Sequence, residues 1–210
     1  MGIRYGDRLL IATTNAGKLR EIRELLPDVR LEVIALSPDF EALAAPEETG
    51  RTFAENARLK ARYYATATGL LTVAEDSGLE IDALDGAPGV LSARYRGDTY
   101  PERFQNLYAD MAARGATAST ARFVAVVALA VPAAISGKEP LIIFEARGVV
   151  EGEIANPPRG DGGFGYDPIF YYPSYGKTLA EVSSAEKLHV SHRGAAFRQL
   201  KTFLSEHAVP

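Results

Sequence analysis

The stretch LLIATTNAGKLREI, residues 9–22, joins a run of apolar residues to a short polar turn, a Gly-Lys pair and the beginning of a helical pattern. This order predicts a buried strand over residues 8–13 that leads through a tight turn into a helix over residues 17–26. The stretch is close to the phosphate-binding loop G-x-x-x-x-G-K-[ST], but the first glycine is missing and Leu19 replaces the magnesium-binding Ser or Thr. Any magnesium ion must therefore be held by other residues.

Length and composition restrict the class of protein. A chain of 210 residues fits one domain, and 47% hydrophobic residues can form a sizeable core. The net charge of −4 argues against nucleic-acid binding, and the absence of cysteine excludes disulfides, thiolate metal sites and thiol nucleophiles. The first residues do not resemble a signal peptide, and the longest apolar run is too short to span a membrane. We therefore expect a soluble cytoplasmic protein.

Strand and helix patterns alternate early in the chain, and a hairpin occupies its centre. Further strands are predicted at 31–36, 70–74, 122–131 and 141–151, and further helices at 52–68, 99–114 and 194–207. Capping-box patterns mark two helix starts, Thr52 with Glu55 and Thr99 with Glu102. The order predicts an α/β fold with a mixed, twisted central sheet flanked by helices.

The turn in the opening stretch can bind an anion. Amide groups at a helix start have no partner within the helix, and the helix dipole favours negative charge there. Thr13, Thr14 and Asn15 can add side-chain hydrogen bonds, Gly17 allows close approach to the backbone, and Lys18 adds a positive charge. An ordinary strand–helix turn capped by Asn15 explains this turn equally well.

Acidic pairs offer ligands for a metal ion. Glu75 and Asp76 follow directly after the strand predicted at 70–74, and ligands bind at the carboxyl ends of strands in α/β sheets. Glu47 and Glu48 form a second acidic pair in a loop. Carboxylate oxygens suit Mg²⁺, which is commonly held by one or two carboxylates together with substrate phosphates. Adjacent acids in a loop are also commonly solvated charge, and this alternative is weakest for Asp76.

Two segments late in the chain could recognise a flat ring. In GGFGYD, residues 162–167, Phe164 can lie against a ring and Asp167 can contact its edge. Lys187 and Arg193 can donate hydrogen bonds to a carbonyl or a phosphate. The alternatives are a flexible turn and a solvated helix face. His189 and His192 lack a third nitrogen or sulfur ligand, so zinc is disfavoured.

Taken in order, the segments TTNAGKLREI, EETGRTFAENARLKA, AEDSGLEIDALDGAPGVLSARY, GGFGYDPIF and SSAEKLHVSHRGAAF resemble the inosine/xanthosine triphosphate pyrophosphatases, or Ham1-like proteins. The resemblance covers nearly the whole chain as a single domain. It implies two lobes around a central cleft, as in the Ham1 and Maf proteins, and a homodimer. It also implies Mg²⁺-dependent hydrolysis of ITP, dITP or XTP to the monophosphate and pyrophosphate, with no nucleic-acid or membrane partner.

The resemblance also implies roles for individual residues. Asp76 would be the proton acceptor and a magnesium ligand, with Glu48 as a further acid at the metal; Glu75 stands where some relatives have Asp, so its reach toward the metal is in question. The residues that would bind substrate are Thr13, Thr14, Asn15, Ala16, Gly17 and Lys18 at the triphosphate, Asn56 and Lys60 facing the phosphates, Ser77, then Phe164, Gly165, Tyr166 and Asp167 around base and sugar, and Lys187, His192 and Arg193 at the purine.

Two rival interpretations differ in class. A Maf-type pyrophosphatase acting on other nucleotides would have a related fold, but it lacks the SHRG and FGYD segments. A nucleotide-binding regulatory module would bind a purine nucleotide without cleaving it, and it would not need Asp76 as a base. The segment PAAISGKEP, residues 132–140, lies in the predicted hairpin loop away from every motif.

Overall fold

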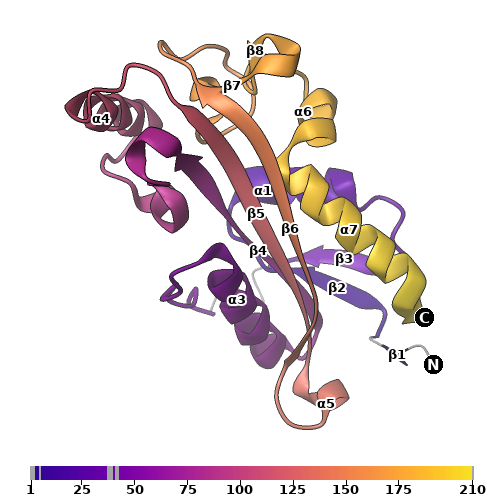
Figure 1. The fold of residues 1–210 in the computed structure, drawn as a ribbon. Coiled ribbons are helices and arrows are strands. Elements are labelled where there is room, and N and C mark those ends of the chain that lie inside the picture. The colour runs from indigo at the N-terminus through magenta and orange to yellow at the C-terminus, as the bar shows by residue number, and fades with distance from the viewer. Residues whose placement is uncertain (1–2, 5, 37–39, 41–42, 210) are drawn as a thin grey trace. The chain divides into compact units, whose positions relative to one another are not determined.

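The computed structural model describes residues 3–4, 6–36, 40 and 43–209 (Figure 1). Its strands are β1(Ile3–Arg4), β2(Arg8–Ile11), β3(Glu32–Ala35), β4(Leu71–Ile81), β5(Thr120–Val131), β6(Leu141–Ile154), β7(Phe170–Tyr172), β8(Lys177–Thr178) and β9(Ala208–Val209). Its α-helices are α1(Ala16–Leu25), α3(Phe53–Thr68), α4(Tyr100–Ala113), α5(Ala133–Ser136), α6(Ser184–Val190) and α7(His192–His207). Helices and strands thus alternate along the first part of the chain, as predicted.

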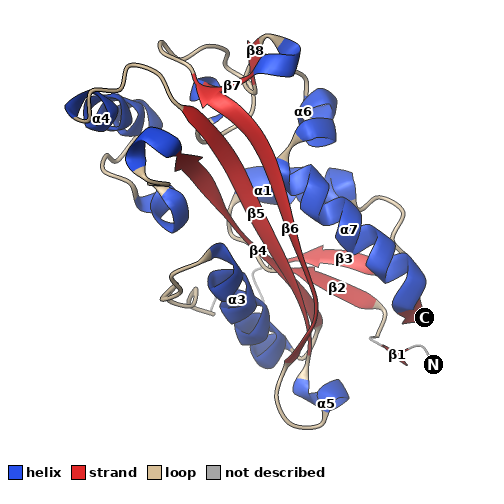
Figure 2. Ribbon diagram, in the orientation of Figure 1, coloured by secondary structure: helices blue, strands red, loops and turns tan. Residues whose placement is uncertain are grey.

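Seven strands form one mixed sheet in the order β3-β2-β4-β5-β6-β7-β8 (Figure 2). Strand β2 pairs in parallel with β3 and β4, whereas β7 pairs antiparallel with β6 and β8. The predicted α/β class, with a mixed sheet flanked by helices, is therefore confirmed. The predicted hairpin is also present as the neighbouring strands β5 and β6, and its loop contains the short helix α5.

The chain divides into two compact units. Unit 1 comprises Met1–Asp76, Ala125–Gly148 and Arg193–Pro210, and unit 2 comprises Ser77–Val124 and Val149–His192. Strands β4, β5 and β6 contribute residues to both units. Two units agree with the two lobes that the resemblance implies, while the central cleft and the assignment of the whole activity to one domain stay predictions.

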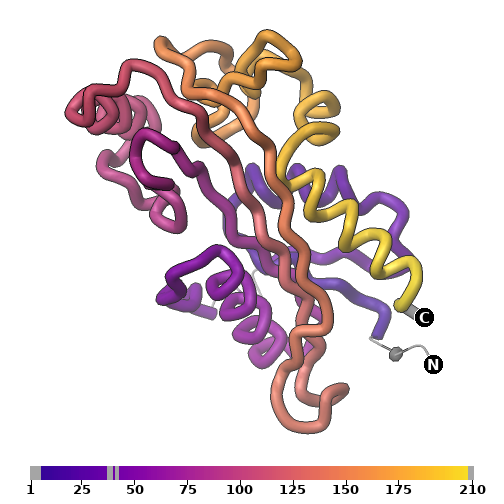
Figure 3. Tube along the Cα trace, in the orientation of Figure 1, coloured from indigo at the N-terminus to yellow at the C-terminus, as the bar shows by residue number. Residues whose placement is uncertain are grey.

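Alternation along the strands explains how unit 1 is built. Successive side chains of a strand point to opposite faces of the sheet. Leu71 and Val73 of β4 join a core cluster with the apolar stripes of α1 and α7, which include Ile22 and Phe197. Helix α3 buries residues that include Ala57, Ala61 and Ala65, and Figure 1 draws α3 and α7 on opposite sides of the strands in this unit. Figure 3 follows the path of the chain to its two ends, where β1 pairs in parallel with β9.

Unit 2 has a core of its own. Leu79 and Ile81 of β4 pack with Leu107 of α4 and with Phe170 of β7, and all four side chains are buried. The later residues of β4 therefore lie in this second core, whereas its earlier residues lie in the core of unit 1. Both units are therefore supported by apolar residues of one continuous strand.

Local signals set the helix ends. Thr52 and Glu55 form the predicted capping box of α3, and Gly69 ends the helix with a left-handed φ of 68°. Thr99 and Glu102 form the predicted capping box of α4. A third box, Ser183 with Glu186, begins α6, a helix that the sequence analysis did not assign.

One strand prediction is wrong. The strand expected at residues 70–74 does not end at EDSG but continues as β4 to Ile81, so Asp76 lies within a strand. The physical reason is the pairing: β2 pairs with β4 only over Leu71–Val73, and beyond that point β4 continues beside β5. Asp76 therefore lies within β4, just beyond the part of this strand that pairs with β2, and not at the end of its own strand.

Candidate active site

Glu75 and Asp76 point to opposite faces of the sheet because they are consecutive residues of β4. Glu75 has the orientation of Val73 and faces α1 and α7, whereas Asp76 lies on the face of α3. Both side chains are almost fully buried, at 4% and 6% residue exposure. The two acids thus contact different side chains on the two faces, and the expectation that both bind one metal ion stays a prediction.

The Asp76 cluster consists of Asp76, Asn56, Lys60 and Glu48. Asn56 Nδ2 donates to Asp76 Oδ2 at 3.1 Å, and Lys60 Nζ donates to Asp76 Oδ1 at 2.9 Å. Both donors lie on α3, one helical turn apart, so one helix holds both carboxylate oxygens. Lys60 Nζ also donates to Glu48 Oε1 at 2.6 Å. Two acids from separate segments thus share one ammonium group.

The charges of this cluster depend on each other. Burial by itself would lower the pKa of Lys60, but the nearby carboxylates of Asp76 and Glu48 outweigh it and raise the pKa above the ordinary value. A buried charge without such partners would be costly. The Lys60 side chain is therefore held as a cation between two carboxylates.

Asn56 connects the Asp76 cluster to the acidic loop. Its side chain is 1% exposed, and its Oδ1 accepts a hydrogen bond from the Gly50 amide at 2.8 Å. A Cβ atom at position 50 would lie only 2.5 Å from Asn56 Oδ1, so this close approach requires glycine. Asn56 thus holds the loop that carries Glu48 against the helix that holds Asp76.

The donor set fits a magnesium ion. Glu48 Oε1 and Asp76 Oδ1 converge on one cation, the Lys60 ammonium. Mg²⁺ is commonly bound by one or two carboxylates, with substrate phosphates and waters as its other ligands. Among the described residues no group of three or more His, Cys, Asp or Glu side chains could hold a metal, so protein ligands beyond this pair are not seen there.

The Glu75 cluster consists of Glu75, Arg193, Glu21 and Lys18. Arg193 Nε and Nη2 donate to the two oxygens of Glu75 at 2.6 and 2.7 Å, and Nη1 donates to Glu21 Oε2 at 2.6 Å. The Lys18 Nζ lies 3.4 Å from Glu75 Oε1. Arg193 is 2% exposed, and although burial alone would lower its pKa, the two carboxylates raise it. This cluster is a buried ion network that joins α1, β4 and α7.

Lys18 has the opposite pKa shift. Burial lowers the pKa of Lys18, and the opposing effect of Glu75 is too small to restore the ordinary value, partly because Arg193 and Lys60 also repel the charge. An ammonium in this position gains from a further negative group. Lys18 is therefore suited to bind an anion at the start of α1.

The turn before α1 has both features that the sequence analysis considered. Asn15 is the N-cap, and its Oδ1 accepts a hydrogen bond from the Lys18 amide at 3.0 Å, while its own amide donates to Thr13 Oγ1. The capping alternative for Asn15 is therefore confirmed. Ala16 and Gly17 lie in the first turn of the helix, where amide groups have no intrahelical acceptor. Thr14, Asn15 and Ala16 are exposed, so the turn is accessible to a ligand.

A separate cluster in unit 2 contains the aromatic loop. Lys187 Nζ donates to Asp167 Oδ2 and lies 4.5 Å from the centroid of the Phe164 ring. Asp167 Oδ2 also accepts from the Phe164 amide at 2.7 Å, and Gly163 has a left-handed φ of 66° with no room for a Cβ beside that oxygen. The loop thus brings a ring, a cation and an acid into contact with one another.

The structure gives contacts for two of the other predicted residues of unit 2, His192 and Tyr166. The buried ring of His192 stacks on Phe123 at 4.8 Å between centroids, and Tyr166 is buried with its hydroxyl donating to the Ser92 carbonyl at 2.7 Å. Gly165 has a left-handed φ of 68°, and Ser77 is half-buried on β4. Burial raises the pKa of Tyr166, which fits a neutral hydroxyl in the core.

One member of the ion network, Glu21, is not among the residues predicted from the sequence. Glu21 is 5% exposed although it lies on a helix of mixed charge, and it binds Arg193 from 172 positions away. The available signal was weak: an acid next to Ile22, on the inward side of the helix. The prediction that Arg193 contacts the purine stays untested, and its observed partners are acids of unit 1.

Fold and clusters together define a class: an α/β protein with an accessible helix start, a carboxylate pair suited to a divalent cation, and an aromatic loop. The chain also matches the Ham1 family over residues 9–203, and it belongs to that family. It is 49% identical to a dITP/XTP pyrophosphatase of Gloeobacter violaceus over 95% of this chain and 98% of that protein. A dITP/XTP pyrophosphatase of Thermus thermophilus is also 49% identical, covering 93% of this chain and 90% of the relative.

Solved structures of the family have the same fold. The HAM1 protein of Coxiella burnetii matches with a TM-score of 0.83 at 45% identity, covering 95% of this chain and 98% of that chain. The Ham1 protein of Staphylococcus aureus matches with a TM-score of 0.79 at 38% identity and the same coverage. Among the described residues, no helix has the length and apolar character of a membrane span.

Proposed function

We propose that this protein hydrolyses non-standard purine nucleoside triphosphates, such as ITP, dITP and XTP, to the monophosphate and pyrophosphate. The names of its relatives support the reaction and the substrate class. The observation that carries the proposal is the convergence of Glu48 and Asp76 on one cation, close enough to the start of α1 for Asp76 and Lys60 to act electrostatically on Lys18. Phosphoryl transfer depends mainly on such positioned charges.

The triphosphate binds at the turn before α1. The amides of Ala16 and Gly17 and the hydroxyls of Thr13 and Thr14 donate to phosphate oxygens, and Lys18 supplies a positive charge. Glu75 holds the Lys18 ammonium at this turn and is itself fixed by Arg193. Glu75 as a magnesium ligand stays a prediction, and its contacts favour this positioning role.

Glu48 and Asp76 would hold magnesium. A bound ion would neutralise negative charge on the phosphate oxygens as the pyrophosphate leaves. Asp76 accepts a proton from the attacking water, whose oxygen forms a bond to the α-phosphorus while the bond from that phosphorus to the bridging oxygen breaks. Asn56 holds the Asp76 carboxylate in a fixed orientation for this step.

The aromatic loop recognises the base. Phe164 stacks on the purine, and Lys187 donates to an acceptor such as the oxygen at C6 of hypoxanthine or xanthine. Adenine has an amino donor at this position, and leaving a buried donor unpaired costs about 1–3 kcal/mol per group. Asp167 orients the Lys187 ammonium, so the pair selects for a base with an oxygen at C6.

The test is pyrophosphate release from ITP, with ATP as the comparison substrate and a magnesium-free reaction as the control. We expect fast, magnesium-dependent release from ITP and slow release from ATP. Binding of ITP without cleavage would indicate a regulatory module instead. Purine triphosphates with an oxygen at C6 are the expected substrates. A preference for other nucleotides would favour a Maf-type enzyme.

The proposal extends to assembly and location, which rest on the resemblance to the family. We propose a homodimer that acts in the cytoplasm, where the nucleotide pool is located. Light scattering on the purified protein measures the mass of the assembly, and a monomeric mass at working concentration would contradict the dimer.

A further inference from the structure

We propose that the Lys60 ammonium is the resident counter-ion of the Glu48–Asp76 pair, and that it must leave this position for a metal ion to bind. The inference rests on the proposed function only for the metal and its ligands. It gives Lys60 a role that phosphate binding alone does not include: Lys60 makes metal binding depend on the arrival of the triphosphate.

The distances place metal and ammonium in competition. Lys60 Nζ lies 2.6 Å from Glu48 Oε1 and 2.9 Å from Asp76 Oδ1. An ion that binds both oxygens at the shorter distances of magnesium coordination would occupy the same space as this nitrogen. The repulsion between the ion and the ammonium adds to the steric exclusion. Lys60 therefore weakens metal binding in the absence of nucleotide.

The two acids stay in place when the ammonium leaves. Asp76 Oδ2 is held by Asn56, which does not compete for Oδ1. The loop that carries Glu48 is tied to Asn56 through the Gly50 amide. The Asp76 carboxylate and the loop that carries Glu48 are thus held in place by contacts that do not involve Lys60. The cation between the two acids can therefore be exchanged.

The displaced ammonium needs a new negative partner. The Lys60 side chain is only 13% exposed, and a poorly solvated charge is costly without a counter-ion. The flexible four-carbon stem of lysine allows its ammonium to move while its backbone on α3 stays fixed. The phosphates of the substrate supply the negative charge, so metal and triphosphate favour each other's binding.

The experiment measures the affinity of nucleotide-free protein for Mn²⁺ or Mg²⁺ by titration calorimetry. Lys60→Met removes the competing charge, and we expect its dissociation constant for the metal to be about tenfold or more below that of the wild type. Lys60→Arg keeps the charge and should bind the metal as weakly as the wild type. Turnover should fall in Lys60→Met because the phosphates lose their cation.

Arg58→Met is the matched control. Arg58 lies on the same helix, and its substitution by Met removes the same positive charge as Lys60→Met. The Arg58 guanidinium, however, is exposed and pairs with Glu145, outside the Asp76 cluster. Its metal affinity should equal that of the wild type. A merely structural role for Lys60 would lower metal affinity together with the melting temperature, whereas competition raises affinity.

Unchanged or weaker metal binding in Lys60→Met, with a melting curve that shows a folded protein, would overturn the inference. The outcome is separate from the fate of the proposed function. If the proposed function is wrong, the wild-type protein will not release pyrophosphate from ITP. The metal titration contains no nucleotide, so its result does not depend on that reaction.

Discussion

The two faces of β4 around residues 75 and 76 carry acids of the same chemistry in different surroundings. On the face of α1 and α7, Glu75 is bound by a buried guanidinium through both oxygens. On the face of α3, Asp76 is bound by one amide and one ammonium, and the ammonium is shared with Glu48. The contacts of Glu75 favour a structural role, and those of Asp76 agree with the proposed role in catalysis.

The largest expected effect is on catalysis, from Asp76→Asn. The carboxamide keeps the shape of the side chain but removes the proton acceptor, so turnover should fall by about 10²–10⁴-fold. Stability should fall as well, by about 1–3 kcal/mol, because Asn56 and Lys60 donate to different oxygens of Asp76 and the carboxamide keeps only one of them. Pyrophosphate release and binding of ITP should be measured together, and near wild-type turnover would remove Asp76 from this role.

Arg193→Met should have the largest effect on stability. It leaves Glu75 and Glu21 buried without their shared cation, and breaking a buried ion network in this way costs about 3–5 kcal/mol. Urea unfolding measures the loss in free energy of unfolding. The comparison between the two faces would be broken if Arg193→Met were as stable as Asp76→Asn.

Asn56→Ala should have an intermediate effect on both properties. The Gly50 amide and Asp76 Oδ2 each lose a buried partner, which costs about 1–3 kcal/mol per group left unsatisfied. Turnover should fall as well, because Asp76 and the loop of Glu48 lose their common contact. If urea unfolding shows the loss while turnover is unaffected, Asn56 supports only the fold.

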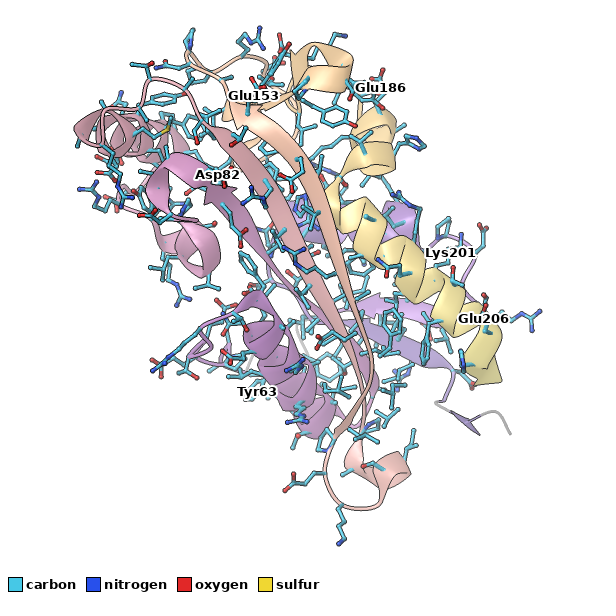
Figure 4. The ribbon with its side chains drawn as sticks, viewed as in Figure 1. Tyr63, Asp82, Glu153, Glu186, Lys201 and Glu206 are labelled. Atoms are coloured by element: carbon cyan, nitrogen blue, oxygen red, sulfur yellow. The ribbon has the colours of Figure 1, made fainter. Side chains whose placement is uncertain are left out.

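The smallest expected effect comes from Lys201→Met, on the exposed side of α7 (Figure 4). Lys201 pairs with Asp28 at 3.1 Å, but the two side chains are 36% and 79% exposed. Exposed ion pairs contribute about 0–1 kcal/mol. Urea unfolding should show a change in that range, with pyrophosphate release unchanged. A loss as large as that of Arg193→Met would mean that burial does not explain the difference between the networks.

The sequence predicted most of the elements because their signals are local. The capping boxes at Thr52 and Thr99 and the glycine at position 69 specify helix ends through contacts a few residues away. Asn56 and Lys60 are four residues apart on α3, a spacing that puts them on one face of a helix, and both contact Asp76. Patterns of this kind need no knowledge of the tertiary structure.

The errors have a common physical origin in distant contacts. The end of β4 depends on its pairing with β5, whose residues lie about fifty positions later in the chain, so the polar residues of EDSG were interpreted as the end of a strand. Once the strand is known to continue, the alternation of side chains separates Glu75 from Asp76. The burial of Glu21 also depends on Arg193, and no local pattern could reveal that partner.

The division of labour between neighbouring acids is tested most directly by the magnesium dependence of pyrophosphate release in Glu48→Gln and Glu75→Gln. We expect Glu48→Gln to need a much higher magnesium concentration for half-maximal rate. Glu75→Gln should keep the wild-type magnesium requirement and instead show a higher KM for ITP, because Lys18 loses its support. An equal increase in the magnesium requirement of both variants would contradict the account.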